Sequence, residues 1–174
     1  MATILLAGEQ VTVAGFEIKG FDYFGTHAYK EDGQALVQAL TDGGHAVEWM
    51  RTNRVPAHFP ETLAALQRYD VVILSDVGSN SLLFHPEMLT QSVRHPNRLA
   101  LLREYVRAGG ALLMVGGWMS FAGVDGRARY HRTPVEDALP VTCEPYDDRQ
   151  EVPEGITPEV VAPEHPVLVG MPAD

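Results

Sequence analysis

Apolar and polar positions alternate in blocks along the first two thirds of the chain, and the block lengths predict strands and helices in turn. Short apolar runs at 3–7, 46–50, 70–75 and 111–115 are typical of buried strands. Segments with helical spacing of apolar residues lie between them, at 31–41, at 60–68 and after the N-cap residue Asn97. This order predicts a single α/β domain over 1–174, built as a three-layer α/β/α sandwich with a mainly parallel, flavodoxin-like sheet.

The run ALLMV at 111–115 predicts a strand buried on both faces, and the residues that follow it predict a sharp turn. Gly116 and Gly117 permit positive φ and close approach of the backbone. In many α/β enzymes such a turn presents a nucleophile at the carboxyl end of a strand. Here the next residue is Trp118, which cannot act as a nucleophile.

Beyond about residue 126 the regular pattern ends, and prolines become frequent. We expect extended segments and turns in this part of the chain, because proline breaks helices and sheet ladders. The last residues, HPVLVGMPAD, contain no obvious closing element. The sequence is therefore interpreted as a version of a longer protein that is truncated at its C-terminus.

Composition narrows the choice of partners. A formal net charge of -10 argues against DNA or RNA, which need a basic surface. No apolar stretch is long enough to span a membrane and no signal peptide pattern is present, so we expect a cytoplasmic protein. The one cysteine, Cys143, lies in a short β-like run and is interpreted as a buried, inert thiol.

Metal and cofactor chemistry is not indicated by the spacing of the seven histidines. No His-x-His or His-x-x-x-His pair occurs. Asp147, Asp148 and Glu9 offer oxygen ligands, but nothing in the sequence brings them together. We therefore predict no metal and no cofactor.

Three polar loops follow the carboxyl ends of predicted strands, where such sheets bind ligands. They span 8–29, 76–80 and 116–131, and the first is long for a connection between a strand and a helix. If the loops converge, they form a pocket for a small-molecule ligand. Its predicted members are Glu9, Gly78, Ser79, Asn80, Gly117, Trp118, Ser120 and His131.

Several long motifs occur in order along the chain: SDVGSN, HPNRLALLREYVRAGGALLMVGGWMSFAG, GRARYHRTPVEDALPV and PYDDRQEVPEG. Together they resemble the glutamine amidotransferase-like family of bacterial cytoplasmic proteins, within the class I glutamine amidotransferase-like superfamily. The resemblance covers nearly all of the chain from Thr3 onward. Family members usually continue past the point at which this chain ends.

The resemblance implies the fold but not glutamine hydrolysis. Active members carry a cysteine on the turn after a strand and a later His-x-Glu pair, and the position of that cysteine resembles Trp118. A His-x-Glu string occurs at His85-Pro86-Glu87, before the turn, and is interpreted as coincidence. In active relatives the loop after the strand that resembles 70–75 supplies N–H groups to an oxyanion, which Gly78, Ser79 and Asn80 could also do.

The individual side chains leave alternatives open. His131 suits a general acid or base, and is otherwise a loop-anchoring histidine. Ser120 would be a nucleophile only with a base such as His131, and is otherwise a hydrogen-bonding serine. Trp118 is either a pocket wall that stacks on a sugar or ring, or a structural plug of the turn. Arg127 and Arg129 could clamp an anion, although pairing with local carboxylates is the simpler interpretation.

Three functions remain open from the sequence. The leading hypothesis is a family member without glutaminase activity that binds a small polar or anionic metabolite, with acid/base chemistry by His131 or Glu9 as an addition. The alternative is a non-catalytic assembly or regulatory module with a vestigial pocket, whose functional feature is a homo-oligomer. A third is an active glutaminase that uses Cys143.

Overall fold

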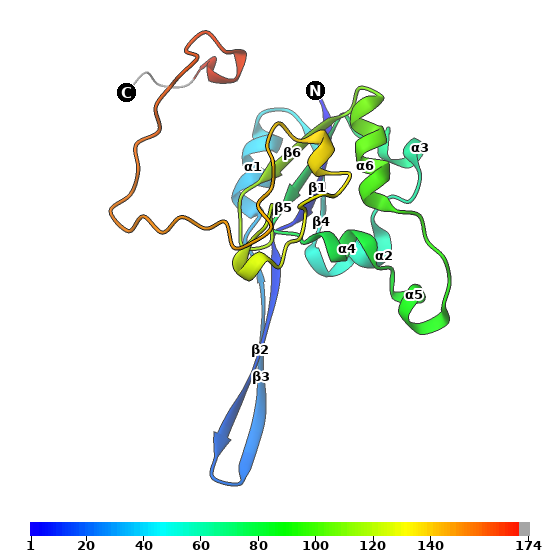
Figure 1. Cartoon of the computed structure of the whole chain (residues 1–174), viewed down its shortest axis with the longest axis vertical. Coiled ribbons are helices and arrows are strands. Elements are labelled where there is room, and N and C mark those ends of the chain that lie inside the picture. The colour runs from blue at the N-terminus through cyan, green and yellow to red at the C-terminus, as the bar shows by residue number, and fades with distance from the viewer. Residues whose placement is uncertain (171–174) are drawn as a thin grey trace.

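A four-stranded parallel sheet forms the centre of the computed structural model, which describes residues 1–170 (Figure 1). Its strands are β1 (Thr3–Gly8), β4 (Ala46–Met50), β5 (Val71–Ser75) and β6 (Ala111–Val115), in the order β4-β1-β5-β6. β1 and β5 are central, and their apolar side chains are buried on both faces. The predicted α/β sandwich with a parallel, flavodoxin-like sheet is confirmed.

Helices cover both faces of the sheet unequally. On one face lie α2 (Val55–His58), α3 (Leu63–Leu66), α4 (Ser79–Leu83) and α6 (Arg98–Arg107), which contribute apolar residues to the main core. On the other face α1 (Gln34–Asp42) packs on a smaller cluster around Ile4, Leu6 and Ile73. No helix of residues 1–170 has the length and hydropathy needed to cross a membrane.

β6 differs from the strand that the sequence predicts, because it is not fully buried. It is the edge strand of the sheet, and its burial alternates along its length. Met114 faces the main core, whereas Leu113 is 50% exposed on the opposite face. The apolar run therefore predicted the strand correctly, but the prediction that both of its faces are buried is wrong.

Helix boundaries follow local capping and turn residues. Asn97 caps α6 as predicted, because its side chain accepts the N–H of Ala100 at 3.1 Å. The predicted helix at 31–41 begins three residues later, because Glu31 ends a strand. The predicted helix at 60–68 shortens to α3. Two further short helices, α4 and α5 (Pro86–Gln91), lie between β5 and α6, where the sequence predicts no helix.

The segment 8–29 is the largest correction, because it is no loop. β2 (Gln10–Lys19) and β3 (Asp22–Glu31) form a ten-pair antiparallel hairpin that projects from the sheet (Figure 1). The strands are joined through Gly20 and Phe21. Gly20 has φ +66 and Phe21 a negative φ, as expected at the centre of a type II′ turn. Strand pairing thus replaces the predicted pocket loop.

The hairpin exposes apolar side chains along its length. Phe16, Ile18 and Tyr23 lie on one face and are more than 70% exposed, and Phe21 at the tip is fully exposed. The rings of Phe16 and Tyr23 contact each other edge to face at 6.4 Å between centroids. These contacts within the hairpin leave most of the apolar surface in water.

From residue 116 to 170 the chain contains turns and three short 3-10 helices, at Val124–Gly126, Glu136–Ala138 and Pro166–Leu168. This agrees with the turns and extended segments that the prolines predict. A further 3-10 turn, Thr52–Arg54, follows β4. The segment after about residue 151 runs away from the sheet and packs little against it (Figure 1).

Candidate functional site

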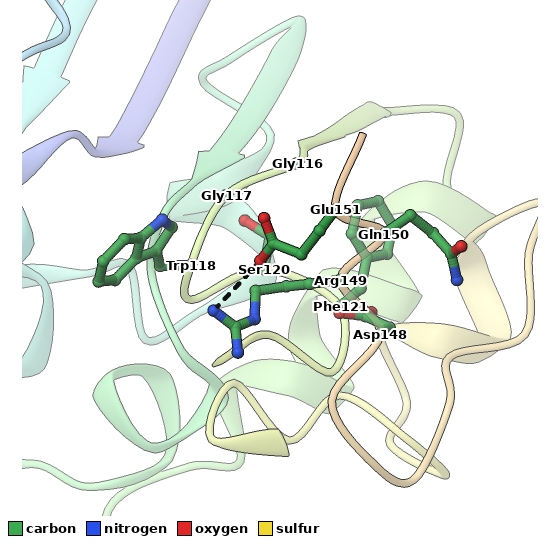
Figure 2. A pocket seen from close by; sticks show the side chains of 9 residues that line it. All are labelled: Gly116, Gly117, Trp118, Ser120, Phe121, Asp148, Arg149, Gln150 and Glu151. Carbon is green, nitrogen blue, oxygen red and sulfur yellow. Dashed lines mark ion pairs between the residues drawn. The ribbon is translucent and has the colours of Figure 1, made fainter. Parts of the chain in front are cut away.

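A cleft of about 500 Å³ lies at the carboxyl end of β6, beside the turn that follows it (Figure 2). This is the edge of a parallel sheet at which ligands are expected. One wall is the turn itself and the other is a distant segment of the chain. The lining residues are Gly116, Gly117, Trp118, Ser120, Phe121, Asp148, Arg149, Gln150 and Glu151.

The turn after β6 is built differently from the one the glycines predict. Neither Gly116 nor Gly117 has positive φ; the left-handed conformation falls instead on Phe121, with φ +52, and on Gly123, with φ +73. Close approach is confirmed at Gly117, because a Cβ atom there would lie 3.1 Å from Oδ1 of Asp76. A side chain at 117 would therefore crowd the Asp76 carboxylate at the end of the neighbouring strand.

Asp76, the residue after β5, holds the turn in place. Its Oδ1 accepts the N–H of Met119 at 2.6 Å, and its own N–H donates to Oγ of Ser120 at 3.2 Å. Ser120 is 2% exposed, so its hydroxyl is fixed in the wall of the cleft. No histidine or lysine lines the cleft among the described residues, so Ser120 has no imidazole or amine there to activate it.

Trp118 is neither buried nor a plug. It is 70% exposed and presents its indole ring at the cleft (Figure 2). No acceptor within residues 1–170 contacts the N–H groups of Gly117 and Trp118. An exposed aromatic face beside two unpartnered donors can hold a ligand that combines a flat group with an oxygen acceptor.

The second wall comes from residues 148–151, which are not among the predicted members of the pocket. Asp148 fixes this segment to the turn, because its carboxylate accepts the N–H groups of Ala122 at 3.0 Å and Gly123 at 3.1 Å. Asp147 accepts the guanidinium of Arg149 at 2.7 Å, and this pairing lowers the pKa of the Asp147 carboxyl.

Arg149 also forms an ion pair with Glu151 at 3.7 Å, drawn as the dashed line in Figure 2. Its guanidinium is 43% exposed as a side chain, so a ligand can reach it. The cleft therefore contains one guanidinium and two carboxylates, Asp148 and Glu151, and its polar groups of both signs favour a polar ligand.

The loop after β5 carries three predicted ligand-binding residues, and none of them lines the cleft. The N–H of Ser79 donates to the carbonyl of Ala128 at 2.9 Å, and its side chain is buried. A Cβ atom at Gly78 would lie 2.8 Å from Cε of Met119. Asn80 is exposed at the beginning of α4. The Ser79 N–H is thus occupied by protein and not free for an oxyanion.

Glu9 stands between β1 and the hairpin, with φ +55. Its carboxylate accepts a short hydrogen bond from the Ser75 hydroxyl, and its N–H donates to the Ser75 carbonyl at 3.2 Å. Glu9 therefore ties the end of β1 to the end of β5. It lies at the predicted edge of the sheet but outside the lining of the cleft.

His131 and Cys143 lie together rather than at the cleft. A ring nitrogen of His131, Nδ1, is 2.6 Å from the carbonyl of Cys143 and 3.7 Å from a Glu136 oxygen. The Cys143 thiol is 2% exposed, and burial raises its pKa to about 11. A thiol in that state is not a nucleophile near neutral pH, which argues against the glutaminase alternative based on Cys143.

Comparison with known proteins now gives the family. A family model described as putative glutamine amidotransferase matches residues 3–174. The chain belongs to this glutamine amidotransferase-like family. The resemblance inferred from the motifs is therefore confirmed. Among proteins of curated function, no match was found.

Two solved structures are similar to this chain in both fold and sequence. The chain is 40% identical to the cytoplasmic protein STM3548 from Salmonella typhimurium, with a TM-score of 0.92, over 98% of this chain and 69% of that one. It is 36% identical to the cytoplasmic protein STM1381 from Salmonella typhimurium LT2, with a TM-score of 0.83, over 91% of this chain and 67% of that one.

Proposed function

We propose that this glutamine amidotransferase-like protein binds a small polar or anionic metabolite in the cleft and does not hydrolyse glutamine. The observation that carries the proposal is the make-up of the cleft: the turn after β6 supplies an exposed Trp118 and two N–H groups without an acceptor within residues 1–170, and the opposite wall supplies the guanidinium of Arg149. The two similar structures bear the names of cytoplasmic proteins, which supports placing this chain in the cytoplasm.

The chemistry of the walls limits the ligand. Arg149 can bind a carboxylate or phosphate through its guanidinium, and the N–H groups of Gly117 and Trp118 can donate to a second oxygen. Trp118 and Phe121 supply apolar surface for the body of the ligand. Asp148 and Glu151 disfavour multiply charged anions, so a singly charged or zwitterionic metabolite fits best.

The binding proposal is tested by calorimetry and thermal shift with a panel of small carboxylates, phosphate monoesters and amino acids. Saturation at 100 times Kd should stabilise the protein by about 2.7 kcal/mol. Trp118→Ala and Arg149→Ala should lose the response, whereas Arg127→Ala should keep it, because Arg127 is exposed and lies outside the cleft. Equal responses in all four proteins would place the ligand elsewhere, and no response to any compound would contradict the proposal.

The absence of glutaminase activity is tested separately, by ammonia release from glutamine. Wild type and Trp118→Cys should both be inactive, because no imidazole lines the cleft among the described residues to deprotonate a thiol at position 118. Activity in wild type that is lost in Cys143→Ala would overturn this part of the proposal and would revive the third hypothesis.

The hairpin favours a second candidate function, a homo-oligomer that forms through its exposed apolar faces. A lone two-stranded hairpin is marginally stable in water, and exposed apolar patches mark interaction surfaces. The occupant we propose is the same hairpin of a second copy. The hairpin carries two lysines against three carboxylates in a chain of net charge -10, so two copies can meet there with little repulsion.

Analytical ultracentrifugation over a range of concentrations tests the assembly. Wild type should sediment as a dimer or larger, and a Phe16→Ser/Tyr23→Ser double variant should sediment as a single chain. Leu89→Ser provides the control, because Leu89 is 77% exposed but lies on α5. A wild type that stays a single chain at every concentration would exclude the assembly without affecting the ligand-binding proposal.

A further inference from the structure

A cluster of histidine and glutamate side chains lies outside the cleft, where α5 and the loop leading to α6 meet the segment before α3. Glu61, His85 and His95 each place a ligand atom within 4.8 Å of the other two. Glu87 adds a second carboxylate, with Oε2 at 3.2 Å from Nε2 of His95 and 3.8 Å from Nδ1 of His85. Residues from three separate parts of the sequence therefore converge.

His95 is held between two carboxylates. Its Nδ1 is 2.8 Å from Oε1 of Glu61, and its Nε2 is 3.2 Å from Oε2 of Glu87. The side chain is only 10% exposed. Two carboxylates around one poorly hydrated imidazole favour a cation at this place.

His85 stacks on His95, with ring centroids 3.8 Å apart and planes at 16°. Its Nδ1 accepts the N–H of Glu87 at 3.2 Å, so this nitrogen carries a lone pair. Its side chain is 11% exposed. Its Nε2 lies 3.4 Å from the carbonyl oxygen of Ala57, so a metal ion at His85 would replace one of these two contacts. The second imidazole beside His95 adds a nitrogen donor to the cluster.

We propose that this cluster binds one divalent transition metal ion of the Zn²⁺ class. Imidazole nitrogens with carboxylate oxygens are the donor set that Zn²⁺, Co²⁺ and Ni²⁺ prefer, whereas Mg²⁺ and Ca²⁺ prefer oxygen alone. Whichever nitrogen of His95 binds the metal, the other faces a carboxylate. That arrangement is the usual carboxylate support of a metal-bound histidine.

The geometry requires a modest closure of the cluster. Ligand atoms around a tetrahedral zinc at bonds of about 2.0–2.1 Å lie roughly 3.4 Å apart, so separations of up to 4.8 Å in the cluster must shorten on binding. Glu87 can follow, because its side chain is 46% exposed. The buried guanidinium of Arg98 interacts with Glu61, but the two carboxylates leave the cluster one net negative charge after Arg98 is counted.

Metal binding at this place would tie the loop before α6 and the beginning of α5 to the segment before α3. None of the four side chains lines the cleft. The site is therefore expected to affect stability, not ligand binding at Trp118. The proposal also explains the His85-Pro86-Glu87 string without a catalytic role.

The test uses protein stripped of metal by a chelator and then titrated with Co²⁺ and Zn²⁺. Wild type should bind one equivalent, with the visible absorption bands of four-coordinate Co²⁺ and a higher Tm in Zn²⁺. Glu61→Gln and His95→Gln should each weaken binding roughly 10-fold or more. His27→Gln should bind as wild type does, because His27 lies on the exposed hairpin.

Circular dichroism of the stripped variants shows whether each is folded, and if His95→Gln is not, Glu61→Gln decides the outcome. Wild type without the Co²⁺ bands would overturn the proposal. Equal Zn²⁺ affinities of Glu61→Gln and wild type would also overturn it, because binding would then come from scattered surface histidines.

Discussion

The four-stranded sheet and the hairpin β2–β3 are made of similar residues in opposite surroundings. Leu5 and Leu74 in the sheet are buried between layers, whereas Phe16 and Ile18 in the hairpin are 74% exposed. Both structures satisfy their backbone hydrogen bonds by strand pairing. Pairing alone therefore does not bury side chains; burial needs a second layer, which the helices give to the sheet and nothing in the described part of the chain gives to the hairpin.

The two regions are also held differently. The sheet is stabilised by the helices that pack on it and by side chains such as Asp76, which joins the ends of neighbouring strands. The hairpin is held mainly by its own ladder and by contacts at its base, where Arg51 donates to the Glu31 carboxylate at 3.1 Å. Substitutions should accordingly have large effects in the sheet and at the junction, and small effects along the hairpin.

The largest effect is expected at the junction, from Gly8→Ala. Gly8 has φ +128, and a Cβ atom would lie 1.6 Å from the Ser75 carbonyl oxygen. Backbone strain and displacement of β5 should cost more than about 3 kcal/mol of unfolding free energy, measured by urea denaturation. Gly44→Ala is the control, because Gly44 also has positive φ but open space around it. Its cost should be about 1 kcal/mol. Equal losses would mean that β1 and β5 can separate.

The next largest effect comes from a pair of substitutions that compares a core position in the sheet with an exposed position in the hairpin. Leu74→Ala in β5 leaves a cavity in the core and should lower the unfolding free energy by about 2–5 kcal/mol. Ile18→Ala in the hairpin should change it by less than about 0.5 kcal/mol at concentrations where the protein is a single chain. A large loss for Ile18→Ala under those conditions would show that the hairpin is covered by this same chain.

Arg98→Lys probes how α6 is fixed to the neighbouring helices α2 and α4. The buried guanidinium donates to carbonyls of both α2 and α4, at 2.9 Å to Pro56 and 2.6 Å to Leu82. A lysine ammonium cannot reach both sets at once, so buried carbonyls lose their donor at a cost of about 1–3 kcal/mol. Thermal unfolding measures the loss. An unchanged Tm would mean that water replaces the guanidinium.

The smallest effect is expected at the base of the hairpin, from Glu31→Gln. The Arg51 guanidinium lowers the pKa of the Glu31 carboxyl, so the ionised form is favoured in the folded chain. This stabilisation is present above the unfolded pKa of Glu31 and is lost as pH falls through the lower, folded value. Wild type should therefore exceed the variant slightly in Tm at pH 7 and match it at strongly acidic pH. A gap that persists in acid would have another cause.

Much of the fold could be predicted because its signals are local. Each strand of the sheet is a short apolar run, and Asn97 marks a helix start by its own side chain. The hairpin was missed because its alternation is interrupted by glycines, at 15, 20 and 25, and because a βα connection was expected there. The II′ turn at Gly20 was the available signal.

The candidate site was predictable only on one wall. Gly117, Trp118 and Ser120 directly follow a strand and line the cleft, and their role in ligand binding stays a prediction. Residues 148–151 were missed, because no periodicity brings a segment some thirty residues further along the chain to that turn. The cluster of Glu61, His85 and His95 was missed for the same reason, since its members share no metal-binding spacing. Long-range contacts of this kind depend on the whole fold.

The two ends of the hairpin lie side by side, with the Asp32 N–H donating to the Glu9 carbonyl at 3.0 Å. β2 and β3 therefore leave the sheet and return to it at one point, as an insertion does. Such an element can be lengthened, shortened or exchanged between relatives without altering the register of β1 with its neighbours. The exposed surface of the hairpin is thus free to diverge faster than the scaffold that carries the cleft.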